Sequence, residues 1–320
     1  MNFYLAPMVG LTGYIYRNAH KAFFNNIDKY FSPFIVTNQS ESFKTRELID
    51  ILPENNPGIV LIPQLLTNDA KDFIHTSRKI KQLGYNEINL NLGCPSKIVT
   101  SKNRGSGFLS KREELDRFLE EIFSEAVTKI SLKTRLGKDQ PEEFYELIEI
   151  FNKYPIEELI IHPRIQKDFY NNKPNLKIFR EALTLSKNPV CYNGDIFTSN
   201  DYKKFSVDFP SVDKLMLGRG VITNPGLILD IRNNIKLEKK TLKDFHDRIY
   251  EDYKRMFPGD RKVLCKMKEL WVYMIRMFSD NARYAKKIRE SKGLCDYDEA
   301  VSSLFREQHI LENSEISSKY

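Results

Sequence analysis

The chain has 320 residues, more than one domain of ordinary size, so we expect a large domain followed by a smaller one. Its 41% hydrophobic and 29% charged residues are typical of a soluble globular protein, and no apolar run approaches the roughly 20 residues of a membrane-spanning helix. The net charge of +7 is concentrated in residues 232–292, which carry 18 Lys and Arg against 9 Asp and Glu. Such a segment either binds a polyanion or forms a solvated helical surface, and charge alone does not separate the two.

The N-terminal stretch MNFYLAPM lacks the charged segment and the apolar run of a secretion signal. Four cysteines stand at positions 94, 191, 265 and 295, without the close pairing of a metal site or a redox motif. We therefore expect a cytoplasmic protein that holds no metal and does not enter a membrane. A monomer is expected.

Eight short apolar segments predict strands along the first part of the chain. They are Phe3–Pro7, Tyr30–Val36, Ile59–Leu65, Glu87–Leu92, Lys129–Thr134, Glu158–His162, Val190–Tyr192 and Lys214–Leu217. Apolar residues at three- and four-residue spacing predict helices at Ala70–Leu83, Lys111–Glu125 and Pro141–Asn152. Alternating β and α elements favour a parallel sheet closed as an eight-stranded (β/α)8 TIM barrel. An open doubly wound sheet is the alternative, but the early turn APMVGLTG does not match its phosphate loop.

Helical patterns replace strands after about residue 240. The stretch Arg261–Phe278 places one apolar stripe on a helix whose other positions are largely basic. We interpret residues 1–235 as the barrel and residues 236–320 as a small all-α domain with a basic face.

The predicted strand ends carry polar or glycine residues, and barrel enzymes place their chemistry at these ends. The loops YNGDI and LGRGV follow the seventh and eighth strands, where barrels commonly bind a phosphate through backbone amides. After the fourth strand, Cys94 stands between Gly93 and Pro95. A free cysteine is usually a small core residue, but these two neighbours indicate a turn.

Seven motifs resemble those of the tRNA-dihydrouridine synthases in order and spacing over nearly the whole chain. They are APM at Ala6–Met8, PQL at Pro63–Leu65, NLGCPSK at Asn91–Lys97, LKTRLG at Leu132–Gly137, HPR at His162–Arg164, NGDI at Asn193–Ile196 and GRG at Gly218–Gly220. The basic C-terminal region is similar to the family's RNA-binding domain. The resemblance implies an FMN-containing barrel that reduces specific uridines of tRNA, with NADPH as the usual electron source.

The resemblance also implies roles for individual residues. FMN contacts would come from Pro7, Met8, Gln64, Lys133, His162, Asn193, Gly194, Asp195, Gly218 and Arg219. Contacts to RNA or to the uracil would come from Asn91, Lys97, Arg135 and Arg164. Lys133 has a chemical reason to lie near the flavin ring, because a cation there stabilises the anionic reduced flavin.

The implied reaction gives Cys94 a role. Reduced FMN would deliver a hydride from N5 to C6 of the uracil, and an acid on the opposite face would protonate C5. A thiol with an ordinary pKa of about 8.5 is mostly protonated at neutral pH and can still donate its proton. Cys94 is therefore the predicted proton donor, whereas the other three cysteines have no comparable setting.

Three questions stay open in the sequence. Ser32 and Pro33 stand where many family members have a Thr-Glu pair, which weakens any prediction of the uridine position, and tRNA is not separated from ribosomal RNA. An FMN barrel acting on a free dihydropyrimidine such as dihydroorotate is an alternative, although a small substrate needs no basic platform. An RNA-binding protein that has lost catalysis is another, although Cys94 and the phosphate loops are intact.

Overall fold

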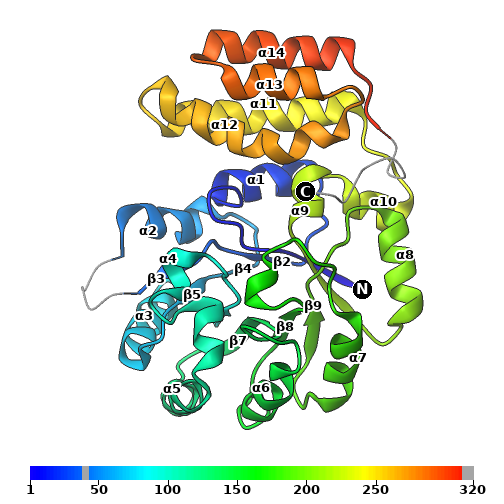
Figure 1. Ribbon diagram of the computed structural model, residues 1–320. Coiled ribbons are helices and arrows are strands. Elements are labelled where there is room, and N and C mark those ends of the chain that lie inside the picture. The colour runs from blue at the N-terminus through cyan, green and yellow to red at the C-terminus, as the bar shows by residue number, and fades with distance from the viewer. Residues whose placement is uncertain (38–42, 312–320) are drawn as a thin grey trace.

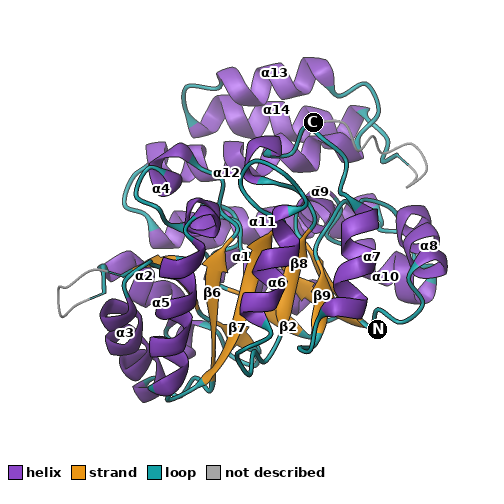
Figure 2. Ribbon diagram, turned by 60° about the horizontal axis from the view of Figure 1, so that its bottom comes forward, coloured by secondary structure: helices purple, strands orange, loops and turns teal. Residues whose placement is uncertain are grey.

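Ten parallel strands form one continuous sheet at the centre of the computed structural model, which describes residues 1–37 and 43–311 (Figures 1 and 2). They are β1 (Asn2–Leu5), β2 (Lys29–Phe31), β3 (Ile35–Val36), β4 (Leu61–Ile62), β5 (Gln64–Leu66), β6 (Glu87–Leu92), β7 (Lys129–Arg135), β8 (Leu159–His162), β9 (Val190–Tyr192) and β10 (Lys214–Leu217). Their order in the sheet is β3-β5-β6-β7-β8-β9-β10-β1-β2-β4. The fold is a parallel β/α barrel-like sheet followed by helices, as the sequence predicted.

The predicted count of eight strands is wrong, because two predicted strands are each divided in the structure. The segment Tyr30–Val36 is interrupted at residues 32–34, and the segment Ile59–Leu65 is interrupted at Pro63. Proline has no backbone N–H to contribute to a strand ladder, and Pro33 and Pro63 lie at these two interruptions. The divided strands still pair with one another, since β2 pairs with β4 and β3 pairs with β5.

Helices cover the outer side of the sheet (Figure 2). They are α1 (Tyr14–Phe23), α2 (Thr45–Ile51), α3 (Ala70–Gln82), α4 (Lys97–Thr100), α5 (Arg112–Ser124), α6 (Glu143–Phe151), α7 (Leu176–Leu185), α8 (Ser199–Asp208), α9 (Arg219–Thr223) and α10 (Leu227–Asn233). The three helices predicted from periodicity correspond to α3, α5 and α6. Helix α3 shows why the pattern works: Asp69 caps its start by accepting a hydrogen bond from the backbone N–H of Asp72, and its apolar stripe is buried.

Side chains of the strands alternate between two separate apolar clusters. Phe3 and Leu5 of β1 point outward into the large core beneath the helices. Tyr4, from the same strand, belongs to a smaller inner cluster with Ala6, Phe31, Ile62, Ile160, Cys191 and Met216. The inside of the barrel-like sheet is therefore packed, and Cys191 is one of its fully buried residues.

In the described part of the chain up to residue 311, four C-terminal helices lie together as a layer beside the barrel-like sheet (Figure 1). They are α11 (Lys239–Met256), α12 (Asp260–Met274), α13 (Ala282–Glu290) and α14 (Leu294–Glu307). The layer is held against the barrel by α11 on α1 and by α12 on α9. The domain boundary after residue 235 stays a prediction. Within the described part of the chain, no helix has both the length and the apolarity that crossing a membrane requires.

A buried polar network joins three helices of this layer. The hydroxyl of Tyr297 in α14 lies 2.6 Å from Nε2 of His246 in α11 and accepts a 2.7 Å hydrogen bond from Nε1 of Trp271 in α12. Nδ1 of His246 lies 2.9 Å from the carboxylate of Asp247, which can only accept, so Nδ1 carries a proton. In the neutral ring, Nε2 then accepts from the hydroxyl of Tyr297. Burial lowers the pKa of His246, in agreement with a neutral ring.

We expect the substitution Tyr297→Phe to lower the free energy of unfolding by about 1–3 kcal/mol, because two buried groups lose their partner. Urea unfolding followed by circular dichroism measures the change. Val272→Ala, at an exposed position of α12, is the control and should have little effect. Equal stability of the two variants would contradict the structural role of Tyr297.

Candidate active site

A pocket opens where the C-terminal ends of five strands meet. Nine of the ten residues predicted to contact a flavin line it: Pro7, Met8, Lys133, His162, Asn193, Gly194, Asp195, Gly218 and Arg219. The tenth, Gln64, is fully buried deeper in the sheet. The structure thus brings together segments far apart in sequence, while the cofactor roles themselves stay predictions.

The two predicted phosphate loops lie directly against each other. A Cβ atom at Gly220 would lie only 2.1 Å from the carbonyl oxygen of Ile196, so only glycine allows this approach. The side chain of Asn193 donates a 2.7 Å hydrogen bond to the carbonyl of Met216, which ties the loop after β9 to the end of β10. Residues 193–197 and 218–220 therefore form one rigid wall of the pocket.

Positive charge surrounds the pocket. Burial lowers the pKa of His162 well below its ordinary value, and the cations of Arg135, Lys133, Arg164 and Arg219 lower it further. Nη1 of Arg164 lies 3.1 Å from Nε2 of His162, and an arginine can only donate, so Nε2 accepts. His162 is thus neutral with its proton on Nδ1.

Asp195 links two of these cations. Its carboxylate accepts hydrogen bonds of 2.9 and 2.5 Å from Arg164 and one of 2.6 Å from Arg219. Arg164 is almost fully buried and also donates to the carbonyl of Asn172. Its predicted contact with RNA stays a prediction, and the structure engages this guanidinium within the protein.

Tyr170 completes the pocket, although the sequence analysis did not single it out. Its half-exposed ring lies 4.3 Å from the guanidinium of Arg219 and 5.9 Å from the ring of His162. It belongs to the loop that follows the HPR motif, and its aromatic character in that loop was the available signal. An exposed aromatic ring at a pocket mouth can stack on a planar ligand.

Cys94 lies just past the end of β6, half-buried, in a turn fixed by Asn91. The side-chain oxygen of Asn91 accepts hydrogen bonds from the backbone N–H groups of Gly93 (3.1 Å) and Cys94 (2.9 Å). Its amide nitrogen donates to Gln64 at 2.8 Å, and Gln64 donates to Asn89 at 2.7 Å. The structure therefore uses two of the predicted contact residues to hold the turn of Cys94.

Arg135 fastens the same turn from the neighbouring strand. Its buried guanidinium donates to the carbonyls of Gly93 (3.0 Å), Ile165 (2.9 Å) and Phe169 (2.8 Å). These bonds join the turn of Cys94 to the loop that carries Tyr170. A substrate contact by Arg135 stays a prediction, since the structure directs these donors to the backbone.

Residues 105 and 106 also contact the backbone of Cys94, although the sequence predicted no role for them. The backbone N–H and the hydroxyl of Ser106 both donate to the carbonyl of Cys94, at 3.1 and 2.9 Å. At Gly105, where φ is +56°, a Cβ atom would lie 2.8 Å from that same carbonyl. The backbone of Cys94 is therefore held on several sides, which is unusual for a residue that only fills space.

The two reactive groups of the site have shifted pKa values. Burial raises the pKa of the Cys94 thiol above its ordinary value, and the neighbouring cations Arg135 and Lys133 oppose only part of this. Burial and the charge of Arg135 lower the pKa of Lys133 to about 7. The thiol is thus protonated at neutral pH, and the amine of Lys133 changes its charge near neutrality.

The remaining predicted contact, Lys97, lies outside the pocket. It is exposed at the start of α4 and borders a separate depression with Lys138 and Gln166. Within residues 1–37 and 43–311, no group of three or more His, Cys, Asp and Glu side chains is arranged to hold a metal ion.

Comparisons with known proteins show which family and fold the chain is similar to. A protein-family model described as "Dihydrouridine synthase (Dus)" matches residues 4–317. The chain is 27% identical over 228 residues to "tRNA-dihydrouridine synthase B" of Pasteurella multocida, covering 70% of this chain and 67% of that protein. It is 30% identical over 284 residues to "Probable tRNA-dihydrouridine synthase" of Helicobacter pylori strain J99, covering 84% and 82%. The solved structure of the old yellow enzyme from Trypanosoma cruzi is similar in fold, with a TM-score of 0.54 at 8% identity, covering 77% and 92%.

The raised pKa of Cys94 predicts a late onset of alkylation as the pH rises. In a Cys265→Ser/Cys295→Ser background, the iodoacetamide reaction of Cys94 should reach half its maximal rate above pH 8.5, because the thiolate forms only at higher pH. Mass spectrometry of the peptide that contains Cys94 measures the rate. A short unstructured cysteine peptide is the control, and a midpoint at or below its value would contradict the assignment.

Proposed function

The chain belongs to the dihydrouridine synthase family, and from this we propose that it reduces specific uridines of tRNA to 5,6-dihydrouridine. The observation that carries the proposal is the position of Cys94. Its protonated thiol lies just past the end of β6, which pairs with the strand of Lys133, and the charges of Lys133 and Arg135 act on it. A positioned acid beside an anion-binding pocket is what the reduction of a uracil requires.

We propose FMN as the cofactor of this pocket. The residues present fit a phosphate-bearing flavin. Among the described residues, three arginines and Lys133 surround the pocket, Asp195 is the carboxylate that lines it, and two glycine-containing loops form its wall. The loops at residues 193–195 and 218–219 would hold the phosphate, and residues 7–8 would hold the ring system by their backbone. When bound, FMN supplies the hydride that it takes from NADPH.

Lys133 is suited to respond to the charge of the cofactor. With a pKa of about 7, its amine is about half protonated at neutral pH while no anion lies beside it. A negative charge next to the amine favours the protonated form, so the positive charge of Lys133 increases where it is needed. Neutral His162, which donates through Nδ1, adds a hydrogen bond without adding charge.

Cys94 donates the proton that completes the reduction. The hydride reaches C6 of the uracil, the negative charge builds toward C5, and the thiol protonates that carbon. Cys94 is left as a thiolate, which takes a proton from solvent. The hydrogen bonds of Asn91, Arg135 and Ser106 keep the turn fixed during this transfer.

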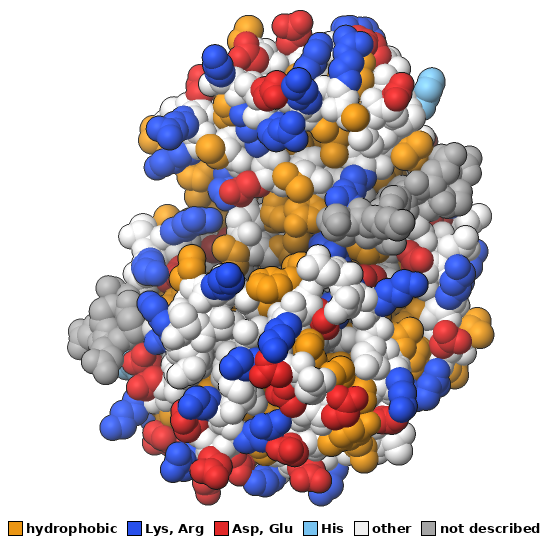
Figure 3. All heavy atoms as spheres, viewed as in Figure 1, with side chains coloured by type: hydrophobic (Ala, Val, Ile, Leu, Met, Phe, Trp, Pro, Cys, Tyr) orange, Lys and Arg blue, Asp and Glu red, His pale blue; other side chains and the backbone are white. Residues whose placement is uncertain are grey.

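The helical layer would bind the RNA. Helix α13 buries Tyr284 and Ile288 and exposes Arg283, Lys286, Lys287 and Arg289 to solvent. Figure 3 shows Lys and Arg side chains on this layer, above a hollow in which hydrophobic side chains are exposed. Such a face neutralises phosphates, whereas a free pyrimidine has no use for it. These phosphate contacts would offset the free energy of unstacking a base, which is about 2–4 kcal/mol.

The test is the reaction itself. Purified protein is incubated with FMN, NADPH and unmodified tRNA, and dihydrouridine is located by mass spectrometry of the digested RNA. We expect dihydrouridine at defined positions of tRNA, and little product from ribosomal RNA or from free uridine. Product from free pyrimidine with indifference to tRNA would contradict the proposal.

A Cys94→Ala variant should keep its flavin and still oxidise NADPH, but form at least about 100-fold less dihydrouridine, because only the proton donor is lost. Flavin absorbance, NADPH consumption and dihydrouridine content are measured on the same sample. Cys265→Ala, at an exposed cysteine away from the pocket, is the matched control. A wild-type yield of dihydrouridine from the Cys94 variant would contradict its role as the proton donor.

A further inference from the structure

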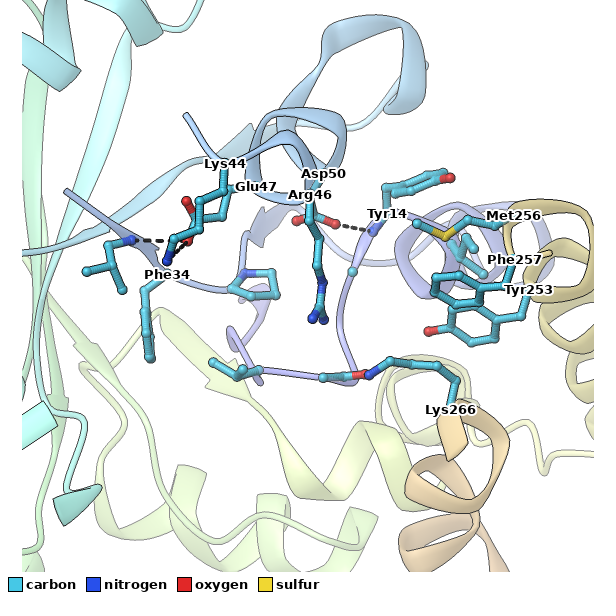
Figure 4. Close-up of a pocket in the computed structure, with 16 residues that line it drawn as sticks. Tyr14, Phe34, Lys44, Arg46, Glu47, Asp50, Tyr253, Met256, Phe257 and Lys266 are labelled. Atoms are coloured by element: carbon cyan, nitrogen blue, oxygen red, sulfur yellow. Dashed lines mark hydrogen bonds and ion pairs between the residues drawn. The ribbon is translucent and has the colours of Figure 1, made fainter. Parts of the chain in front are cut away.

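A second cavity, of about 300 Å³, lies between the barrel-like sheet and the helical layer. Its walls come from the loop after β1, from residues 33–36, from α2 and from the end of α11 (Figure 4). Residues 6–10 separate it from the proposed flavin pocket, since Pro7 and Met8 face that pocket while Val9 and Gly10 face the cavity. The proposed chemistry makes no use of this space.

Aromatic rings line much of the cavity. Tyr253 and Phe257 stand one turn apart at the end of α11 and stack with a centroid distance of 5.9 Å and an interplanar angle of 12°. Phe34 lies on the opposite side of the cavity, and Tyr14 is drawn between Asp50 and Met256 in Figure 4. Tyr253 is buried, whereas Phe34 and Phe257 are partly exposed and offer apolar ring surface to the cavity. Planar bases stack on such surfaces.

Three cations line the cavity among the described residues: Lys44, Arg46 and Lys266. Lys44 is exposed and lies 3.8 Å from the carboxylate of Glu47. The side chain of Arg46 points into the cavity (Figure 4), and within the described part of the chain it makes no hydrogen bond and no ion pair. The carboxylate of Asp50, by contrast, is paired with Arg17 at 3.1 Å and accepts from the backbone N–H of Tyr14 at 2.7 Å. An anion that enters the cavity would therefore meet an uncommitted guanidinium.

Lys266, another cation of the cavity, connects two of its walls. Nζ of Lys266 in α12 donates to the carbonyl of Gly10 at 2.9 Å and pairs with Glu269 at 2.6 Å. This contact joins the helical layer to the loop after β1. The cavity therefore lies at the junction between the helical layer and the barrel-like sheet.

We propose that this cavity binds a nucleotide of the RNA substrate next to the uridine that reacts, an inference that rests on the proposed function. The base stacks on the aromatic wall at Phe257 or Phe34, and the phosphate pairs with Arg46. The cavity lies at the junction of the helical layer and the barrel-like sheet, where an RNA held by the layer can place a nucleotide, and one guanidinium suits one phosphodiester. NADPH is the competing occupant, and flavin reduction tests it. Recognition of this neighbouring nucleotide would contribute to the choice of the uridine that is reduced.

The variant Arg46→Ala tests the phosphate contact. We expect the KM for tRNA to rise about tenfold, and the slope of log K against log salt concentration to fall by about one. Arg78→Ala is the matched control, because Arg78 is an exposed arginine on α3 whose partner is Glu125, outside the cavity. Flavin reduction by NADPH in the absence of RNA is measured alongside for each protein.

The variant Phe257→Leu tests the stacking contact separately, since leucine keeps apolar volume but offers no flat ring. The loss of one base stack predicts a KM for tRNA at least about fivefold higher. Unchanged KM and salt slope in both variants, with wild-type protein active on tRNA, would overturn the inference and leave the proposed function intact. Slower flavin reduction by NADPH in Arg46→Ala would assign the cavity to the dinucleotide and also overturn it. Absence of dihydrouridine with the wild-type protein would instead remove the proposed function.

Discussion

The hydrogen bonds from Arg135 to three backbone carbonyls are the interaction on which the site depends. A buried guanidinium is costly unless its donors are satisfied, so its loops must adopt the one arrangement that presents those carbonyls. That arrangement sets the turn of Cys94 beside the loop of Tyr170. Asn91 and Ser106 fix the same turn from other directions, and the thiol has little freedom to leave the mouth of the barrel-like sheet.

The gathering of cations follows from the same construction. Buried positive charges repel one another, and the protein reduces this cost in two ways. Asp195 neutralises part of the charge on Arg164 and Arg219, and Lys133 loses its proton near pH 7. A bound phosphate and an electron-rich ring would compensate the remaining positive charge, so the pocket suits an anionic cofactor. The thiol of Cys94 keeps its proton at neutral pH because its burial raises its pKa.

Much of this was accessible from the sequence, because period-2 apolar patterns and turn residues depend on local chemistry. The bounds of β6, β9 and β10 agree with the predicted segments. Nine of the ten residues that the family resemblance implies as flavin contacts line one pocket, while their roles stay predictions. The division of two strands at Pro33 and Pro63 was missed, although proline itself was the signal. The backbone partners of Arg135 and the ion pairs of Arg164 could not be foreseen, since they depend on loops that meet only in three dimensions. Tyr170, Ser106 and the cavity around Arg46 escaped for the same reason.

The most direct test of the account is a crystal structure of the protein with FMN. We expect the flavin phosphate against residues 193–195 and 218–219, and the ring system between residues 7–8 and Lys133. The thiol of Cys94 should face the space above the ring. A flavin bound elsewhere, or a thiol that points away from the ring, would contradict it.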